Sequence, residues 1–169
     1  LSGDRVDLSA VKKVMSPYDE FAVETALKHR EANGGEVTAL TLGGAGADKV
    51  LKDAKAIGVD HIVRIDTEDE HDSNALQSAL ATVLTEIGAE VVYCGKSAAD
   101  TGAGSTGPGI AERLGWASVS NVISVAFESG LTVIAPSEGG NARISVPLPA
   151  VISCDKGDMK VRKPNVKGI

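Results

Sequence analysis

Apolar positions recur with a helical period in four stretches of the chain. The clearest stretch places Leu76, Leu80 and Leu84 on one helical face, and Asp72 or Ser73 is suited to cap its first turn. The other three stretches are each followed by glycine, which commonly ends a helix. We therefore predict helices at about residues 20–31, 47–57, 73–87 and 107–114.

Short apolar or β-branched runs stand between these stretches. They cover residues 37–42, 61–65 and 90–94, and their continuous apolar character is typical of strands that are covered on both faces. Because strands and helices follow one another in turn, right-handed βαβ units are expected. The pattern predicts an α/β fold with a doubly wound, mostly parallel sheet and flanking helices.

The rhythm changes after Trp116. Apolar runs at 119–127, 131–135 and 144–146, with a turn at 128–130, favour antiparallel ribbons ahead of the apolar run 151–154. We therefore predict an antiparallel extension after residue 116. At 169 residues the chain has the usual size of one domain, so we predict a single α/β domain over residues 1–169.

Charge and cysteine usage narrow the classes of partner and compartment. Lys and Arg number 17 against 23 Asp and Glu, a net charge of −6, and no basic cluster stands out, which argues against nucleic acid and anionic membranes as partners. Cys94 and Cys154 lie inside apolar runs, as expected of reduced thiols in a cytoplasmic protein. No apolar run approaches the roughly 18 residues of a membrane span, so membrane insertion is not expected.

The glycine-rich segment from Gly95 to Gly107 is the most informative candidate site. It joins the end of a predicted parallel strand to the start of a helix, where open α/β sheets bind ligands. Its glycines, its hydroxyls and the helix N-terminus suit an anion such as a nucleotide phosphate. The segment matches neither a dinucleotide fingerprint nor a Walker loop, and a flexible surface loop explains it equally well.

Other candidate motifs favour ordinary structural roles. The turn Gly43–Gly46 also follows a strand, but a tight connection to the next helix explains it better than ligand contact. The acidic run 66–72 lacks the spacing of a calcium loop and suits a solvated loop with a helix cap. The three histidines have no metal-ligand spacing, and no catalytic set is evident. We predict neither a metal site nor catalytic residues.

Several segments together carry a family resemblance that extends over essentially the whole chain. The residues at 16–24, 95–100, 106–116, 138–140 and 149–153 resemble motifs of the β subunit of electron transfer flavoproteins. Ser16, Ala135 and Ala142 depart from the usual residues of these motifs. The family's first strand, which lies mid-sheet, and its C-terminal arm have no counterpart between residues 1 and 169. The resemblance thus leads us to expect further sequence at both ends.

The resemblance implies a heterodimer in which an α subunit holds most of a redox FAD, while this subunit binds a structural AMP and helps to enclose the flavin. Electrons would pass from flavin dehydrogenases to a quinone reductase or a similar acceptor, so the chain would be an electron carrier and not an enzyme. Tyr18 would lie near the flavin ring. The cofactor-binding residues carried over by position are Ser16, Pro17, Tyr18, Asp19, Leu42, Asp100, Thr101, Gly102, Ala103, Gly104, Ser105, Thr106, Gly107, Pro108, Gly109, Ile110 and Ala111.

The resemblance also assigns a partner-binding residue, Val166, as the apolar anchor that docks into dehydrogenases. Its polar, turn-forming neighbours favour an exposed tip, and packing against the partner subunit is the alternative. In electron-bifurcating relatives a second FAD fills the AMP pocket, and these residues leave that option open. A stand-alone adenine-nucleotide sensor of the universal-stress type is the alternative function, with an adenine-nucleotide α-hydrolase third. The ribbons after residue 116 favour the electron carrier.

Overall fold

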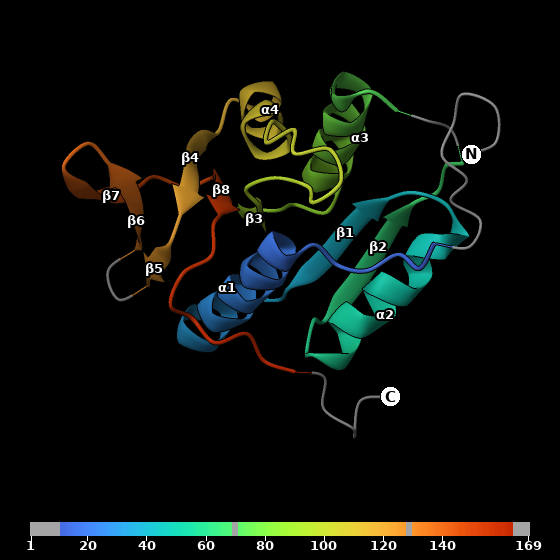
Figure 1. The fold of residues 1–169 in the computed structure, drawn as a ribbon, viewed down its shortest axis with the longest axis horizontal. Coiled ribbons are helices and arrows are strands. Elements are labelled where there is room, and N and C mark those ends of the chain that lie inside the picture. The colour runs from blue at the N-terminus through green and yellow to red at the C-terminus, as the bar shows by residue number, and fades with distance from the viewer. Residues whose placement is uncertain (1–10, 69–70, 128–129, 164–169) are drawn as a thin grey trace.

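The computed structural model describes residues 11–68, 71–127 and 130–163, and it has a mixed α/β architecture (Figure 1). The predicted helices and the strands before residue 95 all form, with α1 beginning at Pro17, slightly earlier than predicted. The elements are α1 (Pro17–Asn33), β1 (Thr38–Leu42), the short 3₁₀ helix η1 (Ala45–Ala47), α2 (Asp48–Ala56), β2 (His61–Ile65), α3 (Ser73–Glu86), β3 (Val91–Gly95), α4 (Thr106–Leu114), β4 (Ala117–Val122), β5 (Ser124–Ala126), β6 (Leu131–Ser137), β7 (Gly140–Val146) and β8 (Ala150–Cys154).

The parallel strands form two ladders. β1 pairs with β2, and β8 lies between β3 and β4, with Ala150 opposite both Val91 and Ala117. Every residue of β8 is buried, whereas β1 and β3 are half-buried throughout. In the described part of the chain β1 and β3 do not pair with each other, so each keeps one unpaired edge.

Helices cover both faces of the parallel strands (Figure 1). On one face α1 packs on β3 and β8, and α2 packs on β1 and β2; on the other, α3 and α4 pack together. Residues of β8 alternate between these faces, because Ile152 belongs to the core beneath α1 and Val151 to the core beneath α4. The predicted α/β class with flanking helices is confirmed.

The antiparallel extension is a separate sheet in the order β5-β6-β7. One prediction about it is wrong: Ala117–Val122 is not a ribbon strand but a parallel edge strand of the β8 ladder. Its alternating exposure resembles that of a ribbon because one face of the strand packs on the core through Ala117 and Val119 while Ser118 and Ser120 on the other face are exposed. A register shift lies between Val119 and Val122, with Asn121 at φ 57°, and the pairing continues to Val122, opposite Cys154, before β5 begins.

Candidate functional site

The end of β3 meets the beginning of α1. The Gly95 amide donates a 2.7 Å hydrogen bond to Oδ1 of Asp19. A Cβ atom at Gly95 would lie 2.9 Å from the Asp19 nitrogen and 2.9 Å from Cβ of Tyr18, so this close approach requires glycine. The contact brings two segments of the predicted site together, although they are far apart in the sequence.

A cavity of about 110 Å³ opens at this junction. Its volume is below the roughly 300 Å³ at which small-molecule pockets begin, so it suits a phosphate-sized group and not a whole nucleotide. Three of the predicted contact residues line it: Asp19, Gly104 and Thr106. The remaining lining residues are Cys94, Gly95, Lys96, Ser97 and Ala98.

The N-terminus of α4 borders this cavity. Its first backbone N–H groups have no acceptor within the helix, and no side chain caps them. The loop that leads into the helix turns through Gly102 and Gly104, at φ 63° and 60°, a region open mainly to glycine. The geometry leaves amides of Thr106 and Gly107 available to an anion, with the helix dipole adding a favourable field.

Two buried polar side chains hold this loop in place. Gln77 of α3 donates a 3.0 Å hydrogen bond to the carbonyl of Ser105, and its amide fills the space beside Gly109. Ser153 lies beneath Gly107, where a Cβ atom would come within 2.3 Å of its Oγ. The sequence analysis missed both residues. The signal for Gln77 is that a polar residue stands on the apolar face of α3, seven positions before Leu84. No local sequence pattern distinguishes Ser153.

At the α1 side of the cavity, Lys96 joins three segments. Its ammonium lies 4.9 Å from the centroid of the Tyr18 ring and 2.9 Å from a carboxylate oxygen of Asp155. The carboxylate raises the pKa of Lys96, which keeps this cation charged. Ser16 occupies the N-cap position of α1 but makes no side-chain cap, and its Oγ is buried without a hydrogen-bond partner among the described residues. Lys96 lies in the family motif at 95–100, and Asp155 lies two residues after the motif at 149–153. Neither residue was predicted to belong to the site.

Burial is the largest cause of the pKa shifts of Asp19, Cys94 and Cys154. It raises the pKa of Asp19, against the opposing effect of the Gly95 amide. It also raises the pKa of Cys94 to about 11 and that of Cys154 to about 12, so neither thiol is activated. Among the described residues, the junction therefore offers binding groups and no activated thiol.

The other predicted residues lie outside the lining of this cavity. Leu42 ends β1, and Ile110 and Ala111 are buried in the core beneath α4. Asp100 and Thr101 form a local turn in which the Thr101 amide donates to Asp100. Also outside the lining are Ser16, Pro17, Tyr18, Gly102, Ala103, Ser105, Gly107, Pro108 and Gly109. Val166 is outside the described residues.

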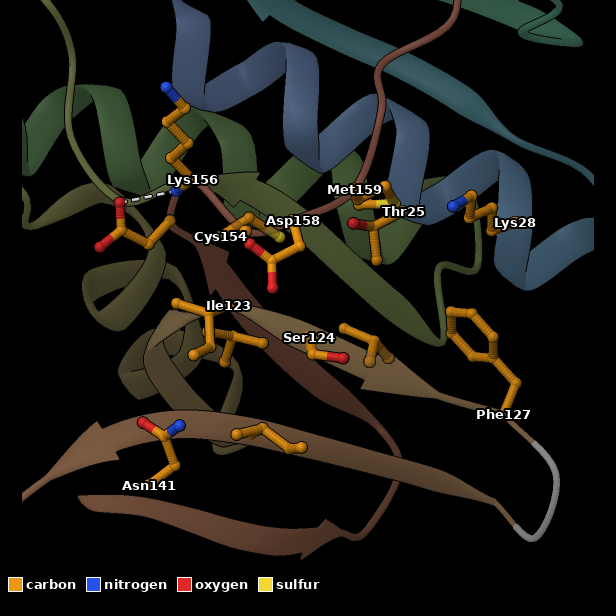
Figure 2. Close-up of a pocket in the computed structure, with 15 residues that line it drawn as sticks. Thr25, Lys28, Ile123, Ser124, Phe127, Asn141, Cys154, Lys156, Asp158 and Met159 are labelled. Carbon is orange, nitrogen blue, oxygen red and sulfur yellow. Dashed lines mark hydrogen bonds between the residues drawn. The ribbon is translucent and has the colours of Figure 1, made fainter.

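A second cavity, of about 580 Å³, lies elsewhere, between α1, the β5-β6-β7 sheet and residues 154–159 (Figure 2). Figure 2 shows Thr25 and Lys28 of α1 on one side and Asn141 of β7 on the other. None of the predicted cofactor-binding residues lines it. The larger of these two cavities is therefore not the one that the predicted site residues line.

The described residues contain no cluster of three or more His, Cys, Asp or Glu side chains arranged to hold a metal ion. Each histidine instead has a local partner: His29 with Tyr93, His61 with Glu36 and His71 with Thr67. Over the same part of the chain, no helix combines the length and the apolar character of a membrane span.

Comparison with known proteins identifies the family. The sequence model of the electron transfer flavoprotein domain matches residues 5–168. The chain is 31% identical to the electron transfer flavoprotein subunit beta of Bacillus subtilis, covering 92% of this chain and 62% of that protein. It is 34% identical to Protein FixA of Azorhizobium caulinodans, covering 90% and 58%.

A further relative, the electron transfer flavoprotein subunit beta of Syntrophomonas wolfei, is 30% identical over 100% of this chain and 68% of its own length. The chain thus spans about three fifths of the first two relatives and slightly more of this one. The chain therefore belongs to the electron transfer flavoprotein family, and the relatives described are β-subunit and FixA proteins.

Proposed function

We propose that this chain forms the nucleotide-binding part of the β subunit of a heterodimeric electron transfer flavoprotein. The observation that carries the proposal is the phosphate-sized cavity between Asp19 and the N-terminus of α4, in a chain of this family. In this proposal AMP is a structural ligand, and an α subunit holds the FAD that this chain helps to enclose. Electrons pass from flavin dehydrogenases to a quinone reductase or a similar acceptor.

Three features of the junction support AMP as the ligand. The α4 amides suit one phosphate group. Ser16, at the N-cap position of α1 and outside the cavity lining, has a buried Oγ with unused hydrogen-bonding capacity among the described residues. Lys96 lies at the same cavity and offers a positive charge that Asp155 partly balances. With a cavity of about 110 Å³, the ribose and adenine would extend over the surface or require the loop 96–104 to move.

The flavin supplies the redox chemistry when it is bound, and this chain makes and breaks no covalent bond. Its residues hold the nucleotide and present Tyr18, whose half-buried ring is kept in place by Lys96, toward the partner subunit. The family match favours this carrier over the stand-alone sensor. The separate β5-β6-β7 sheet favours it as well, because a minimal sensor has no need of it.

The experiment is purification of the native complex, followed by identification of every nucleotide that denaturation releases. We expect a yellow heterodimer that releases one AMP and one FAD. Two FAD and no AMP would identify a bifurcating type with flavin in the same pocket. A colourless homodimer that binds ATP would contradict the proposal and support the sensor.

A further inference from the structure

The small cavity beside α4 contains a carboxyl group as well as groups that suit an anion. Asp19 lines it from α1, while Gly104 and Thr106 line it from the loop and the first residue of α4. At about 110 Å³ the cavity has room for one group of phosphate size. A phosphate group seated at the α4 amides would therefore lie against the Asp19 carboxyl.

The position of the Asp19 carboxyl is fixed by β3. Its Oδ1 accepts the 2.7 Å hydrogen bond from the Gly95 amide, and a Cβ atom at Gly95 would lie only 2.8 Å from Oδ1. Among the described residues this is the one hydrogen bond to the carboxyl, so its second oxygen keeps its bonding capacity. An ionised carboxylate can only accept hydrogen bonds, whereas a protonated carboxyl can also donate one.

The charges around Asp19 do not offset a phosphate group with two negative charges. Among the described residues, Lys96 is the cation that lines the cavity, and its ammonium already pairs at 2.9 Å with Asp155. Burial raises the pKa of Cys94 to about 11 and that of Cys154 to about 12, so both thiols are neutral at pH 7. The α4 amides and the helix dipole remain to oppose the repulsion between Asp19 and a phosphate group.

Two acidic groups in so small a space retain a proton more readily than either does alone. A phosphate monoester loses its last proton near a pH of about 6, so it carries two negative charges at pH 8. Like charges in contact disfavour ionisation of both groups, and the proton then belongs to the pair. Burial raises the pKa of Asp19, with the Gly95 amide acting in the opposite direction, and an adjacent anion would raise it further.

We propose that the site binds AMP together with one proton, which is shared between the Asp19 carboxyl and the phosphate group. The proton comes from solvent, and the O–H of one group donates a hydrogen bond to an oxygen of the other. This inference rests on the proposed function, because it takes AMP as the ligand. It adds that Asp19 sets the protonation state of the bound nucleotide, so that nucleotide binding is coupled to pH.

The test is calorimetric titration of AMP into the native heterodimer after removal of its bound nucleotide. Repeating the titration in buffers of different ionisation enthalpy gives the number of protons taken up per nucleotide. We expect a value near one at pH 8 and a smaller value near pH 5, where free AMP already carries the proton. By linkage, uptake of one proton lowers the affinity by up to about tenfold for each unit of rising pH. No proton uptake by the wild-type protein at pH 8 would overturn the proposal without the need for any variant.

Asp19→Asn tests the residue itself, because its amide oxygen can still accept from the Gly95 N–H while the side chain does not titrate. The variant should take up almost no proton at pH 8, and its affinity for AMP should change little between pH 7 and pH 9. It should therefore bind AMP more tightly than the wild-type protein at pH 9, a gain that damage to the fold does not produce. Full proton uptake by this variant would place the proton elsewhere and refute the role of Asp19.

Glu20→Gln is the matched control, since Glu20 is the next residue of α1, is exposed and does not line the cavity. It removes the same charge and should leave the proton uptake unchanged. An equal loss of uptake in this control would indicate a general effect of net charge and would overturn the proposal. If the wild-type protein binds AMP without taking up a proton, this inference fails while the proposed function stands. If it binds no AMP, the proposed function itself fails, and this inference with it.

Discussion

Gly95 and Gly107 show how single residues shape the candidate site. Each occupies a point where a side chain would collide with a neighbouring segment: Gly95 with the start of α1, and Gly107 with Ser153 and Cys94. Neither has a φ angle that demands glycine, so the reason is close approach and not backbone conformation. A reading of this loop as only a flexible surface segment does not explain why its ends are so tightly packed.

Gly107→Val tests this packing. A Cβ atom would lie 2.3 Å from Oγ of Ser153 and 2.8 Å from Sγ of Cys94, so the start of α4 must shift away from β8. We expect a loss of bound nucleotide and a destabilisation of about 1–3 kcal/mol, typical of overpacking. Nucleotide per heterodimer and the urea midpoint are the measurements. Gly140→Val, where nothing lies within 4 Å, is the control, and an unchanged nucleotide content in Gly107→Val would contradict the assigned site.

The cysteines should be unreactive in the folded protein. Burial raises the pKa of Cys94 to about 11, so at pH 8 only about one side chain in a thousand is a thiolate. Cys154, with a pKa of about 12, is still less ionised. We expect slow alkylation of both thiols in the native protein and rapid alkylation in denaturant, measured by mass spectrometry over time. Rapid labelling of the native protein at either position would refute the buried, unactivated environment.

At the scale of elements, α1 connects the proposed functional parts. Its first turn carries Asp19, which meets β3, and its middle carries Glu24, which pairs with Arg162. Further along, His29 accepts or donates at 2.8 Å to the Tyr93 hydroxyl and stacks on Phe127. Polar residues on the inner face of this helix are therefore contacts to other elements, which explains why its apolar periodicity is weaker than that of α3.

Helix α3 depends on its cap. The Asp72 carboxylate accepts a 2.7 Å hydrogen bond from the Ala75 amide, as the sequence predicted for Asp72 or Ser73. Asp72→Ala should lower the free energy of unfolding by about 1 kcal/mol, measured by urea denaturation. Glu112→Ala, an exposed α4 residue without an ion pair in the described chain, should change it far less. Equal effects of the two substitutions would show that the cap contributes nothing specific.

At the scale of the whole molecule, the described residues form three apolar cores. The largest contains Val133 of β6 and Ile152 of β8, with Tyr93 and Phe127 packed against it, and it joins the antiparallel sheet to the parallel strands. His29 lies at the edge of this core, where burial lowers its pKa. His29 contacts Tyr93 of the parallel strands and Phe127, which follows β5 of the antiparallel sheet. Protonation of His29 therefore affects the contact between the two sheets.

The pH dependence of stability follows from that shift. Because the folded protein binds the His29 proton less readily than the unfolded chain, the unfolded state gains protons first as pH falls below about 6.5. His29 thus contributes stability that is present above pH 6.5 and is lost as the pH falls through its lowered folded pKa. Unfolding free energies from pH 8 to pH 5 should show this fall.

His29→Gln is the variant for that measurement, since glutamine can still hydrogen-bond the Tyr93 hydroxyl but does not titrate. Its stability should fall less between pH 7 and pH 5 than that of the wild-type protein. His61→Gln serves as the control because His61 lies at an exposed strand end. Parallel pH profiles for wild type and His29→Gln would rule out His29 as the source of the dependence.

Local patterns in the sequence determined the helices, the strands before residue 95 and the α/β class. Periodicity, caps and glycine stops act over a few residues, so Asp72, Gly58 and Gly115 could be interpreted without the fold. The motifs around residues 16–24 and 95–107 likewise indicated the family, and they predict the nucleotide site that we propose. Their residues could be named in advance because they follow one another along the chain.

Tertiary structure decided which of these residues meet. β8 enters between β3 and β4 and makes β4 a parallel edge strand, which its alternating pattern did not reveal. Lys96 and Asp155 are 59 residues apart, and Glu24 and Arg162 are 138 apart. No local pattern encodes such pairs, because their attraction appears only after the chain has brought β8 and residues 155–163 beside α1. The elements were therefore determined by local sequence, and the cavity, the Glu24–Arg162 contact and the order of strands by long-range packing.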